Sequence, residues 1–332
     1  MCIAESVDKK QAPRSLVSGG AGFVGSHLVD KLLEQGHTVT AIDNLSTGRI
    51  ENLKEAKKYG LVFHFVEGDI SKCSELPLGP FDFIWHLASP ASPPDYRRLS
   101  LETMAVNSEG TRNLLNLALQ DKSTFLLAST SEVYGDPLVH PQPETYWGHV
   151  NPIGERACYD ESKRFAEALT MEYSRRFGLD SRIIRIFNTY GPRMREKDGR
   201  VVSNFISQAL QGIPLTIYGD GQQSRSFQYI DDLIEGICRT MYSSYCQPIN
   251  LGNPKEFTVL ELAQQVLALT GSQSQLTFAP LPQDDPRQRK PLIEVAKKVL
   301  QWEPIIPLQE GLRRTIADFR KYYQDSGAVL QS

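Results

Sequence analysis

Residues 15–25 read SLVSGGAGFVG, a short apolar run that passes into three glycines, Gly19, Gly22 and Gly25. Beyond them, hydrophobic residues recur at helical spacing up to Leu32, which predicts a strand, a tight turn and a helix in that order. Glycines at this spacing let the backbone turn sharply, approach a pyrophosphate and pack the helix closely on the strand. The N-terminus of such a helix attracts an anion, so the segment predicts a phosphate-binding turn.

A second apolar strand over residues 38–43 ends in Asp43. In a dinucleotide-binding unit, a carboxylate at this place accepts both hydroxyls of the adenosine ribose and repels the additional phosphate of NADP, so Asp43 favours NAD. The alternative is that Asp43 only caps the following turn, residues 44–48. The sequence leaves both interpretations open.

Strands and helices then alternate along the chain. Four further strands are predicted from apolar runs, at residues 61–66, 81–88, 124–129 and 181–187, with a helix at 107–119. This alternation indicates an α/β protein with a doubly wound parallel sheet, the Rossmann architecture. Ligands bind at the carboxyl ends of such strands, where Asp69 and residues 87–89 stand. The Pro-rich run 89–96 lies at the same edge, and we expect it to lack regular structure.

The second half of the chain is richer in loops. Residues 188–193, NTYGPR, end the last predicted strand, and the chain is expected to leave the first domain there. Hydrophobic patterns predict helices at 230–241, 258–269 and 308–322 and a strand at 248–252. We expect two interleaved domains, an NAD-binding Rossmann domain made of 13–187 plus 229–252 and a smaller α/β substrate-binding domain made of 188–228 plus 253–325.

Tyr159 and Lys163 stand four residues apart near the start of a predicted helix over 159–177, so both side chains lie on one face. Ionising a tyrosine near pH 7 costs roughly 4 kcal/mol. An ammonium group at about 4 Å contributes about 4 kcal/mol at an effective dielectric near 20. Lys163, helped by a cationic nicotinamide, would therefore make Tyr159 a base for alcohol oxidation. Ordinary helices also carry Tyr and Lys at this spacing.

The strand before this helix ends in the polar residues Thr130, Ser131 and Glu132. Polar side chains at a strand end point towards a substrate. Thr130 is placed to hydrogen-bond the reacting hydroxyl beside Tyr159, and Glu132 adds a second ionisable group near the same carbon. The alternative is that the hydroxyl residues only cap a helix.

Two later stretches, residues 218–227 and 282–291, gather arginines among turn residues. Arginine forks suit a diphosphate, and the rings of Tyr218 and Phe227 are candidates for stacking on a nucleobase. Surface loops also carry arginines without any ligand, so the sequence leaves a binding role and a purely structural role open for both stretches.

The composition argues against several classes of protein. The 332 residues are 40% hydrophobic and 23% charged, with a net charge of -3, so we expect a globular chain that does not bind nucleic acid. Its 5 cysteines and 6 histidines show no metal-ligand spacing, which predicts free thiols and no metal. No run approaches the roughly 18 apolar residues of a membrane span, and the N-terminal residues are polar, so we expect a cytoplasmic protein without a membrane anchor.

Together these residues resemble the extended short-chain dehydrogenase/reductase family, which acts on nucleotide sugars, over most of the chain. Within that family, the runs at 86–94 (HLASPASPP), 129–160 and 283–286 (QDDP) are similar to UDP-glucuronate decarboxylases. The resemblance implies a catalytic set made of Thr130, Glu132, Tyr159, Lys163 and Arg289. It also implies UDP-glucuronate as the substrate and NAD as the cofactor.

The remaining site residues are expected from strand ends, turns and this resemblance. The expected cofactor contacts are Gly19, Gly22, Phe23, Val24, Gly25, Asp43, Asn44, Thr47, Gly48, Asp69, Ile70, Leu87, Ala88, Ser89, Tyr159, Lys163 and Thr189. The expected substrate contacts are Ser131, Asn188, Arg200, Asn204, Tyr218 and Arg225. No metal ligand is expected.

The resemblance implies oxidation of UDP-glucuronate at C4, loss of carbon dioxide from the resulting β-keto acid, and return of the hydride to give UDP-xylose and NAD. Oxidative decarboxylases, which stop at UDP-4-keto-pentose and release NADH, and sugar-nucleotide 4,6-dehydratases carry similar residues. Typical dTDP-glucose dehydratases have Asp-Glu where this chain has Ser131-Glu132, which favours decarboxylation. The family commonly forms homodimers through a four-helix interface, for which residues 107–119 and 159–177 are the candidates.

The chain departs from the decarboxylase pattern at several positions. Asp95, Arg97 and Arg98 stand where family members usually have a His-Tyr-Met sequence and a short Asn-Pro sequence. Glu155 stands where proline is common, and Ser162 stands where glycine is common. None of these changes removes an expected catalytic group. Asp95 lies closest to the expected substrate pocket, so its change bears on substrate affinity and on the order of the loop.

Overall fold

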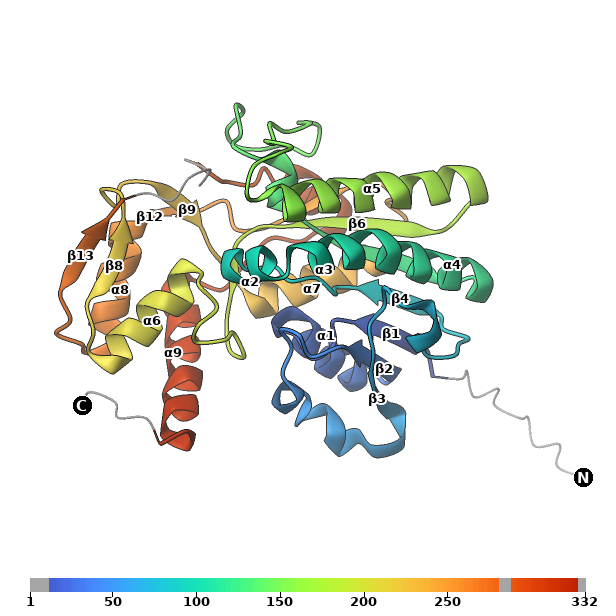
Figure 1. The fold of residues 1–332 in the computed structure, drawn as a ribbon, viewed down its shortest axis with the longest axis horizontal. Helices are drawn as coiled ribbons and strands as arrows, with labels where there is room; N and C mark the ends of the chain where they lie inside the picture. The colour runs from blue at the N-terminus through green and yellow to red at the C-terminus, as the bar shows by residue number, and fades with distance from the viewer. Residues whose placement is uncertain (1–11, 281–287, 328–332) are drawn as a thin grey trace, which may run out of the picture.

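The computed structural model describes residues 12–280 and 288–327 of the chain. A seven-stranded parallel sheet lies at its centre, with the order β11-β6-β5-β4-β1-β2-β3 (Figure 1). The strands are β1 (Arg14–Ser18), β2 (Thr38–Asp43), β3 (Phe63–Glu67), β4 (Phe83–His86), β5 (Thr124–Thr130), β6 (Ser181–Ile186) and β11 (Ile249–Leu251). The strand order runs outward from β1 in both directions. The predicted doubly wound Rossmann sheet is therefore confirmed.

Four of these strands, β3, β4, β6 and β11, are shorter than the sequence predicts, and β6 and β11 differ by only one residue at an end. β3 begins at Phe63 and not at residue 61, because Ala56–Val62 form a 3-10 helix that leaves Leu61 92% exposed. β4 stops at His86, and the chain leaves the sheet over residues 87–89, which line a cleft. The larger differences, in β3 and β4, arise where the chain passes from the sheet to its surface.

Helices cover both faces of the sheet (Figure 1). One face carries α1 (Phe23–Glu34) and α7 (Ile230–Tyr242), and the other carries α4 (Thr111–Asp121) and α5 (Ala157–Phe177). The predicted helices 159–177 and 230–241 thus agree with α5 and α7 within two residues at each end.

The alternation of side chains along β1 builds the two cores. Successive residues of a strand point to opposite faces. Leu16 lies in a buried cluster with Leu114 of α4, whereas Val17 lies in a different cluster with Leu28 of α1 and Leu233 of α7. The sheet is therefore held between helices on both sides, and only its edges and strand ends are left for a site.

The predicted helix at 107–119 is part of a longer helical stretch. It consists of α3 (Ser100–Ala105), a π-helical turn (Val106–Gly110) and α4. Asn107 lies inside the π turn. Its side-chain amide nitrogen donates hydrogen bonds to the Ser89 hydroxyl at 3.0 Å and to the Ser162 hydroxyl at 3.2 Å. π-helical turns are frequent at functional sites, and this one ties the end of β4 to α5.

The prediction that the Pro-rich run 89–96 lacks regular structure is wrong for its second half. Pro93–Arg98 form helix α2. Pro93 and Pro94 fit the first turn, because the first amides of a helix have no partner inside the helix. The helix buries Asp95 and Tyr96, which follow the prolines.

The remaining elements pack beside the carboxyl ends of the sheet, at the left of Figure 1. They are α6 (Val201–Gln211), α8 (Val259–Thr270), α9 (Leu308–Asp325) and three strand pairs, β7 (Thr189–Tyr190) with β10 (Gln228–Tyr229), β8 (Leu215–Tyr218) with β13 (Leu276–Ala279), and β9 (Ser224–Ser226) with β12 (Glu256–Thr258). Phe205, Leu262 and Phe319 of the three helices share one buried cluster with Val17. The two parts of the molecule therefore have a continuous core, and the division into interleaved domains stays a prediction.

Within the described ranges, no helix combines the length and the apolar character needed to cross a membrane. The same residues contain no group of three or more His, Cys, Asp or Glu side chains placed to hold a metal ion. The run 283–286, which carries part of the resemblance, and the first residues of the stretch 282–291 lie outside the described residues.

Candidate active site

The glycine turn between β1 and α1 is as tightly packed as its sequence requires. Gly19 has φ +73°, and a Cβ there would lie 2.8 Å from the Cα of Ala88 on the neighbouring strand end. A Cβ on Gly25 would lie 2.0 Å from the carbonyl oxygen of Gly19. Larger residues would push the start of α1 away from the sheet, so these glycines set the position of the helix N-terminus.

Asp43 lies beside this turn at the end of β2. Its carboxylate accepts hydrogen bonds from the amides of Ala21 at 3.0 Å and Leu45 at 2.9 Å. Burial raises the pKa of Asp43, and the amide hydrogen bonds oppose this rise. A Cβ on Gly48 would lie 2.8 Å from the Asp43 carboxylate, so glycine lets the turn close around it. Asp43 therefore does cap the turn, as one interpretation held, and also faces a cleft.

That cleft has about 600 Å³ of empty space, part of it open to solvent, at the carboxyl ends of β1 to β4. It is lined by many of the residues expected to contact the cofactor: Gly19, Asp43, Asn44, Thr47, Asp69, Ile70, Leu87, Ala88 and Ser89. Glu102 and Val106, which the sequence did not single out, also line it. A buried carboxylate beside a glycine turn fits the adenosine part of a dinucleotide.

The other expected cofactor residues do not line this cleft. Phe23 and Val24 begin α1. The Thr189 hydroxyl is engaged inside the protein, since it donates to the carbonyl of Phe187 at 2.9 Å and accepts from the side chain of Gln228 at 3.0 Å. Its contribution to the site is therefore mainly to fix the chain between the two parts of the molecule.

Thr130, Tyr159 and Lys163 come together where β5 ends beside the first turns of α5. All three are buried. The Thr130 and Tyr159 hydroxyls share a hydrogen bond, and Lys163 Nζ lies 6.0 Å from the centre of the Tyr159 ring. Lys163 donates to the carbonyl oxygen of Ala128 at 2.9 Å, which holds its side chain beneath the tyrosine.

Burial dominates the ionisation of this group. It raises the pKa of Tyr159, against the hydrogen bond from Thr130 and the positive charge of Arg200. Burial also lowers the pKa of Lys163 to about 7. In the protein by itself Tyr159 is therefore a neutral phenol, and a cationic ligand beside it would favour the phenolate.

Glu132 lies next to this group and is bound by two arginines. Arg289 donates from both terminal nitrogens to the two carboxylate oxygens, with Nη2 at 2.8 Å from Oε2, and Arg156 donates to Oε2 as well. Burial raises the pKa of Glu132, but the two arginine charges outweigh burial and lower it to about 2. Glu132 is therefore a carboxylate at neutral pH. Arg156 was missed from the sequence, although it stands only three residues before Tyr159.

Tyr96 and Asp160 complete the surroundings of Tyr159, and the sequence singled out neither of them. The Tyr96 and Tyr159 rings are stacked, with centroids 5.0 Å apart and planes 5° from parallel. The Tyr96 hydroxyl and Asp160 Oδ1 are buried and make no hydrogen bond to any residue that the structure describes. Burial, with the Glu132 charge next, raises the pKa of Asp160 to about 7.

The expected substrate residues fall into two groups. Ser131 is buried next to Thr130, and the charge of Arg200 acts on Tyr159. The backbone of Arg225 forms an isolated β-bridge with that of Arg289, which brings Arg225 to the edge of the same site.

Asn188, Asn204 and Tyr218 lie further along the smaller part. The Asn188 carbonyl accepts from the amide of Gln228 at 2.9 Å, and Asn204 Nδ2 donates to the Gly199 carbonyl at 3.2 Å. Tyr218 is 44% exposed and remains a candidate for stacking, but Phe227 is buried in the core, so its predicted stacking role is wrong.

The arrangement combines a glycine turn, an acid at the end of β2 and a buried Thr-Tyr-Lys group. The NAD dependent epimerase/dehydratase family matches residues 15–252. The chain belongs to this family. The resemblance inferred from the sequence is thereby confirmed.

Members of the epimerase/dehydratase family named as decarboxylases are similar over most of the chain. UDP-glucuronic acid decarboxylase 1 of Xenopus tropicalis is 51% identical over 315 residues, covering 95% of this chain and 74% of that protein. UDP-glucuronic acid decarboxylase 1 of Arabidopsis thaliana is 54% identical over 310 residues, covering 92% of this chain and 70% of that protein.

Solved structures of epimerases share the fold of the family. The UDP-glucose 4-epimerase of Thermotoga maritima, with UDP-glucose, has a TM-score of 0.86 at 32% identity and covers 93% of this chain and 99% of that chain. The UDP-glucuronic acid 4-epimerase of Bacillus cereus, a Tyr-to-Phe variant with NAD and UDP-4-deoxy-4-fluoro-glucuronic acid, has a TM-score of 0.83 at 28% identity. It covers 93% of this chain and 100% of that chain.

Proposed function

We propose that this chain binds NAD and converts UDP-glucuronate to UDP-xylose and carbon dioxide. The observation that carries the proposal is the burial of Thr130, Tyr159 and Lys163 as one group beside the Glu132–Arg289 ion pair. The decarboxylase relatives and the cofactor bound in the Bacillus cereus epimerase support it.

Tyr159 takes the proton of the C4 hydroxyl, with Thr130 hydrogen-bonded to both reacting oxygens and Lys163 beneath the ring. When bound, NAD would supply the hydride acceptor for C4 and, once reduced, the hydride that C4 needs at the end of the cycle. The glycine turn and Asp43 hold the pyrophosphate and the adenosine ribose.

Oxidation at C4 leaves a ketone β to the C6 carboxylate, and such an acid loses carbon dioxide readily. The electron pair of the broken bond becomes an enolate whose oxygen lies at C4, where the Thr130 and Tyr159 hydroxyls donate hydrogen bonds. C5 then takes a proton from a water molecule held at the Glu132–Arg289–Arg156 group, and a solvent proton neutralises the hydroxide that is left. Because Glu132 is already ionised there, it orients this water molecule and is not itself the acid.

The state of Glu132 also favours decarboxylation over 4,6-dehydration. A dehydratase needs an acid that protonates the leaving C6 hydroxyl. Here Ser131 is a poor proton donor, and Glu132 is held ionised by two arginines. The oxidative decarboxylase that releases NADH remains the second candidate, since it uses the same residues up to the return of the hydride.

The test is to incubate the purified protein with UDP-glucuronate, with and without added NAD, and to identify the product by NMR while following NADH absorbance. UDP-xylose without net NADH is the expected result. UDP-4-keto-pentose with stoichiometric NADH would identify the oxidative enzyme, and no turnover of UDP-glucuronate would contradict the proposal.

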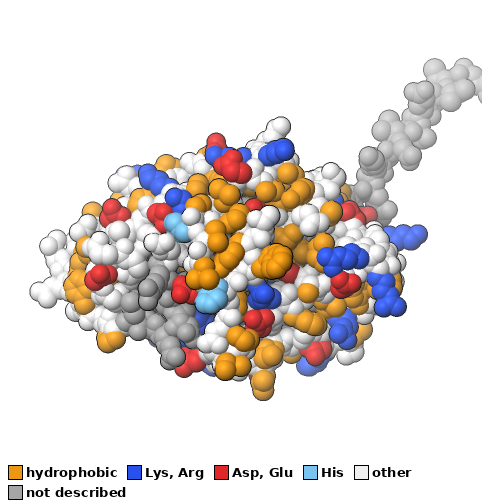
Figure 2. All heavy atoms as spheres, turned by 90° about the horizontal axis from the view of Figure 1, so that it is seen from above, with side chains coloured by type: hydrophobic (Ala, Val, Ile, Leu, Met, Phe, Trp, Pro, Cys, Tyr) orange, Lys and Arg blue, Asp and Glu red, His pale blue; other side chains and the backbone are white. Residues whose placement is uncertain are grey.

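We also propose a homodimer formed through the helical layer that contains α3 and α5. Leu101 and Met104 of α3 are 75% and 46% exposed, Phe165 of α5 is 44% exposed, and the two helices are in contact. Figure 2, which views the molecule from the side of α5, shows hydrophobic side chains gathered on that face. Sedimentation of the wild type and of Leu101→Glu tests this, and a monomeric wild type would contradict it. A cytoplasmic location stays a prediction from the sequence.

A further inference from the structure

Residues 193–200, here named the strap, join β7 to α6 without regular secondary structure. Three ion pairs tie the strap to three other elements. Arg193 pairs with Asp30 of α1 at 2.5 Å, Arg195 with Asp95 of α2, and Glu196 with Arg49 at 2.6 Å. A segment without secondary structure is thus fixed at several points to elements far from it in the sequence.

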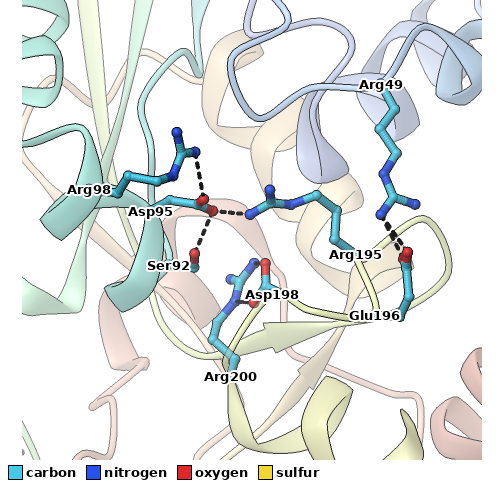
Figure 3. A network of polar contacts seen from close by, with 8 residues as sticks. All are labelled: Arg49, Ser92, Asp95, Arg98, Arg195, Glu196, Asp198 and Arg200. Carbon is cyan, nitrogen blue, oxygen red and sulfur yellow. Dashed lines mark hydrogen bonds and ion pairs between the residues drawn. The ribbon is translucent and has the colours of Figure 1, made fainter.

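Two of these partners belong to segments that adjoin the cleft. Arg49 follows the turn 44–48, and its amide donates to the carbonyl of Ala21 in the glycine turn at 3.0 Å. Asp95 belongs to α2, which follows the cleft-lining residues 89–90. Figure 3 shows Arg195 reaching Asp95 and Glu196 reaching Arg49 from neighbouring positions of the strap. The strap therefore connects two segments that adjoin the cleft, although none of its own residues lines it.

The far end of the strap leads towards the reacting group. The Arg200 guanidinium lies 6.0 Å from the ring centre of Phe23, the first residue of α1, and its charge also acts on Tyr159. A Cβ on Gly199 would lie 2.5 Å from Pro94 Cγ, and Gly199 has φ +86°, so the chain passes against α2 here. The strap thus connects the glycine turn, through Arg49 and Arg200, with the surroundings of Tyr159.

Asp95 is the best-connected partner of the strap. Its side chain is 9% exposed, and besides Arg195 it accepts from the Ser92 hydroxyl at 2.6 Å and from Arg98 at 3.3 Å. Removing either partner of a largely buried pair leaves the other charge uncompensated, which makes the pair hard to break singly. The Arg98 side chain is 59% exposed, so its contribution to the same carboxylate is weak.

We propose that the strap retains the reduced cofactor during turnover and that the Asp95–Arg195 pair thereby determines which product is released. The inference rests on the proposed function. While NADH stays bound, its hydride returns to C4 and the product is UDP-xylose. If NADH leaves first, UDP-glucuronate and NAD yield UDP-4-keto-pentose, carbon dioxide and NADH.

The test compares Asp95→Asn, Arg195→Gln and Glu196→Gln with Arg98→Gln, the matched control that removes only the exposed partner of Asp95. NADH is bound to each protein and chased with excess NAD in a stopped-flow instrument, and the loss of NADH fluorescence gives the dissociation rate. We expect NADH release at least fivefold faster in Asp95→Asn, Arg195→Gln and Glu196→Gln. In Arg98→Gln we expect it within twofold of wild type. Glu196→Gln leaves α2 untouched, so it remains informative if an α2 variant is misfolded.

The second readout is the fraction of product found as UDP-4-keto-pentose with NADH. We expect this fraction to rise in the order of the dissociation rates. NADH dissociation rates equal to that of wild type in all variants would overturn the role of the strap and leave the proposed function standing. A wild type that binds NADH but leaves UDP-glucuronate unchanged would overturn the proposed function, and the dissociation rates would still decide whether the strap retains the cofactor.

Discussion

Arg289 donates hydrogen bonds from both terminal nitrogens to the two carboxylate oxygens of Glu132, across a sequence separation of 157 residues. The pair joins the end of β5 to a segment near the C-terminal part of the chain. Because Arg156 binds the same carboxylate, two positive charges hold Glu132 ionised in a buried place. The charge state of this group connects the stability of the protein with its chemistry.

Replacing Arg289 with Gln removes one of these two charges. We expect the free energy of unfolding to fall by about 3 to 5 kcal/mol, because breaking a buried pair leaves an incompletely compensated charge. We also expect UDP-xylose formation to be lost, since Glu132 loses the partner that fixes both of its carboxylate oxygens. Urea unfolding and product NMR measure the two effects. The control is Arg314→Gln, whose pair with Glu310 is largely exposed and should change stability by no more than about 1 kcal/mol; equal effects in both variants would contradict the account.

Asp43→Ala removes the acceptor of the Ala21 and Leu45 amides as well as the group proposed to bind the ribose. We expect weaker NAD binding and a smaller preference for NAD over NADP, because no carboxylate repels the ribose phosphate. Stability should fall by about 1 to 3 kcal/mol, the cost of unsatisfied buried amides. Fluorescence titration with both cofactors is the measurement. Unchanged affinities with reduced stability would leave Asp43 only its turn-capping role.

The Asp160 carboxyl predicts a dependence of stability on pH. Its pKa is raised from 3.8 to about 7 by burial and the Glu132 charge, against Arg156 and Arg289. Between about pH 4 and pH 7 the folded protein holds a proton that the unfolded chain has released, so this group's contribution to stability falls as pH rises. Asp160→Asn does not titrate. Urea unfolding at pH 5 and pH 8 should show the variant gaining stability relative to wild type at the higher pH, and a constant difference would refute this.

Tyr159→Phe keeps the ring stacked on Tyr96 and removes the hydroxyl that shares a hydrogen bond with Thr130. We expect hydride transfer to fall by about 100-fold or more, as for the loss of a general base, while NAD affinity stays nearly unchanged. Single-turnover NADH absorbance and a cofactor titration give the two values. A variant as active as wild type would remove Tyr159 from the role of base.

The features that the sequence predicted best are those set by local chemistry. The glycine turn needs Gly19 and Gly25 because a Cβ at either position would collide with backbone. The alternation of predicted strands with predicted helices was enough to predict the parallel sheet. The spacing of Tyr159 and Lys163 placed both residues on α5 beside Thr130.

The features that the sequence missed depend on tertiary packing. Pro93 and Pro94 read as loop residues, yet they open α2, and only the packing of that helix brings Tyr96 onto Tyr159. Arg156 acquires its role because β5 ends opposite it. No spacing rule joins Asp95 to Arg195, which lie 100 residues apart in the sequence.

The most direct test of the central claim follows the hydride itself. UDP-glucuronate carrying deuterium at C4 is incubated with the purified protein, and the product is examined by NMR and mass spectrometry. The account predicts UDP-xylose that has kept the deuterium at C4, with no net NADH. UDP-xylose with hydrogen at C4, or UDP-4-keto-pentose with an equivalent amount of deuterated NADH in solution, would contradict a closed cycle in which the same cofactor molecule takes the hydride and returns it.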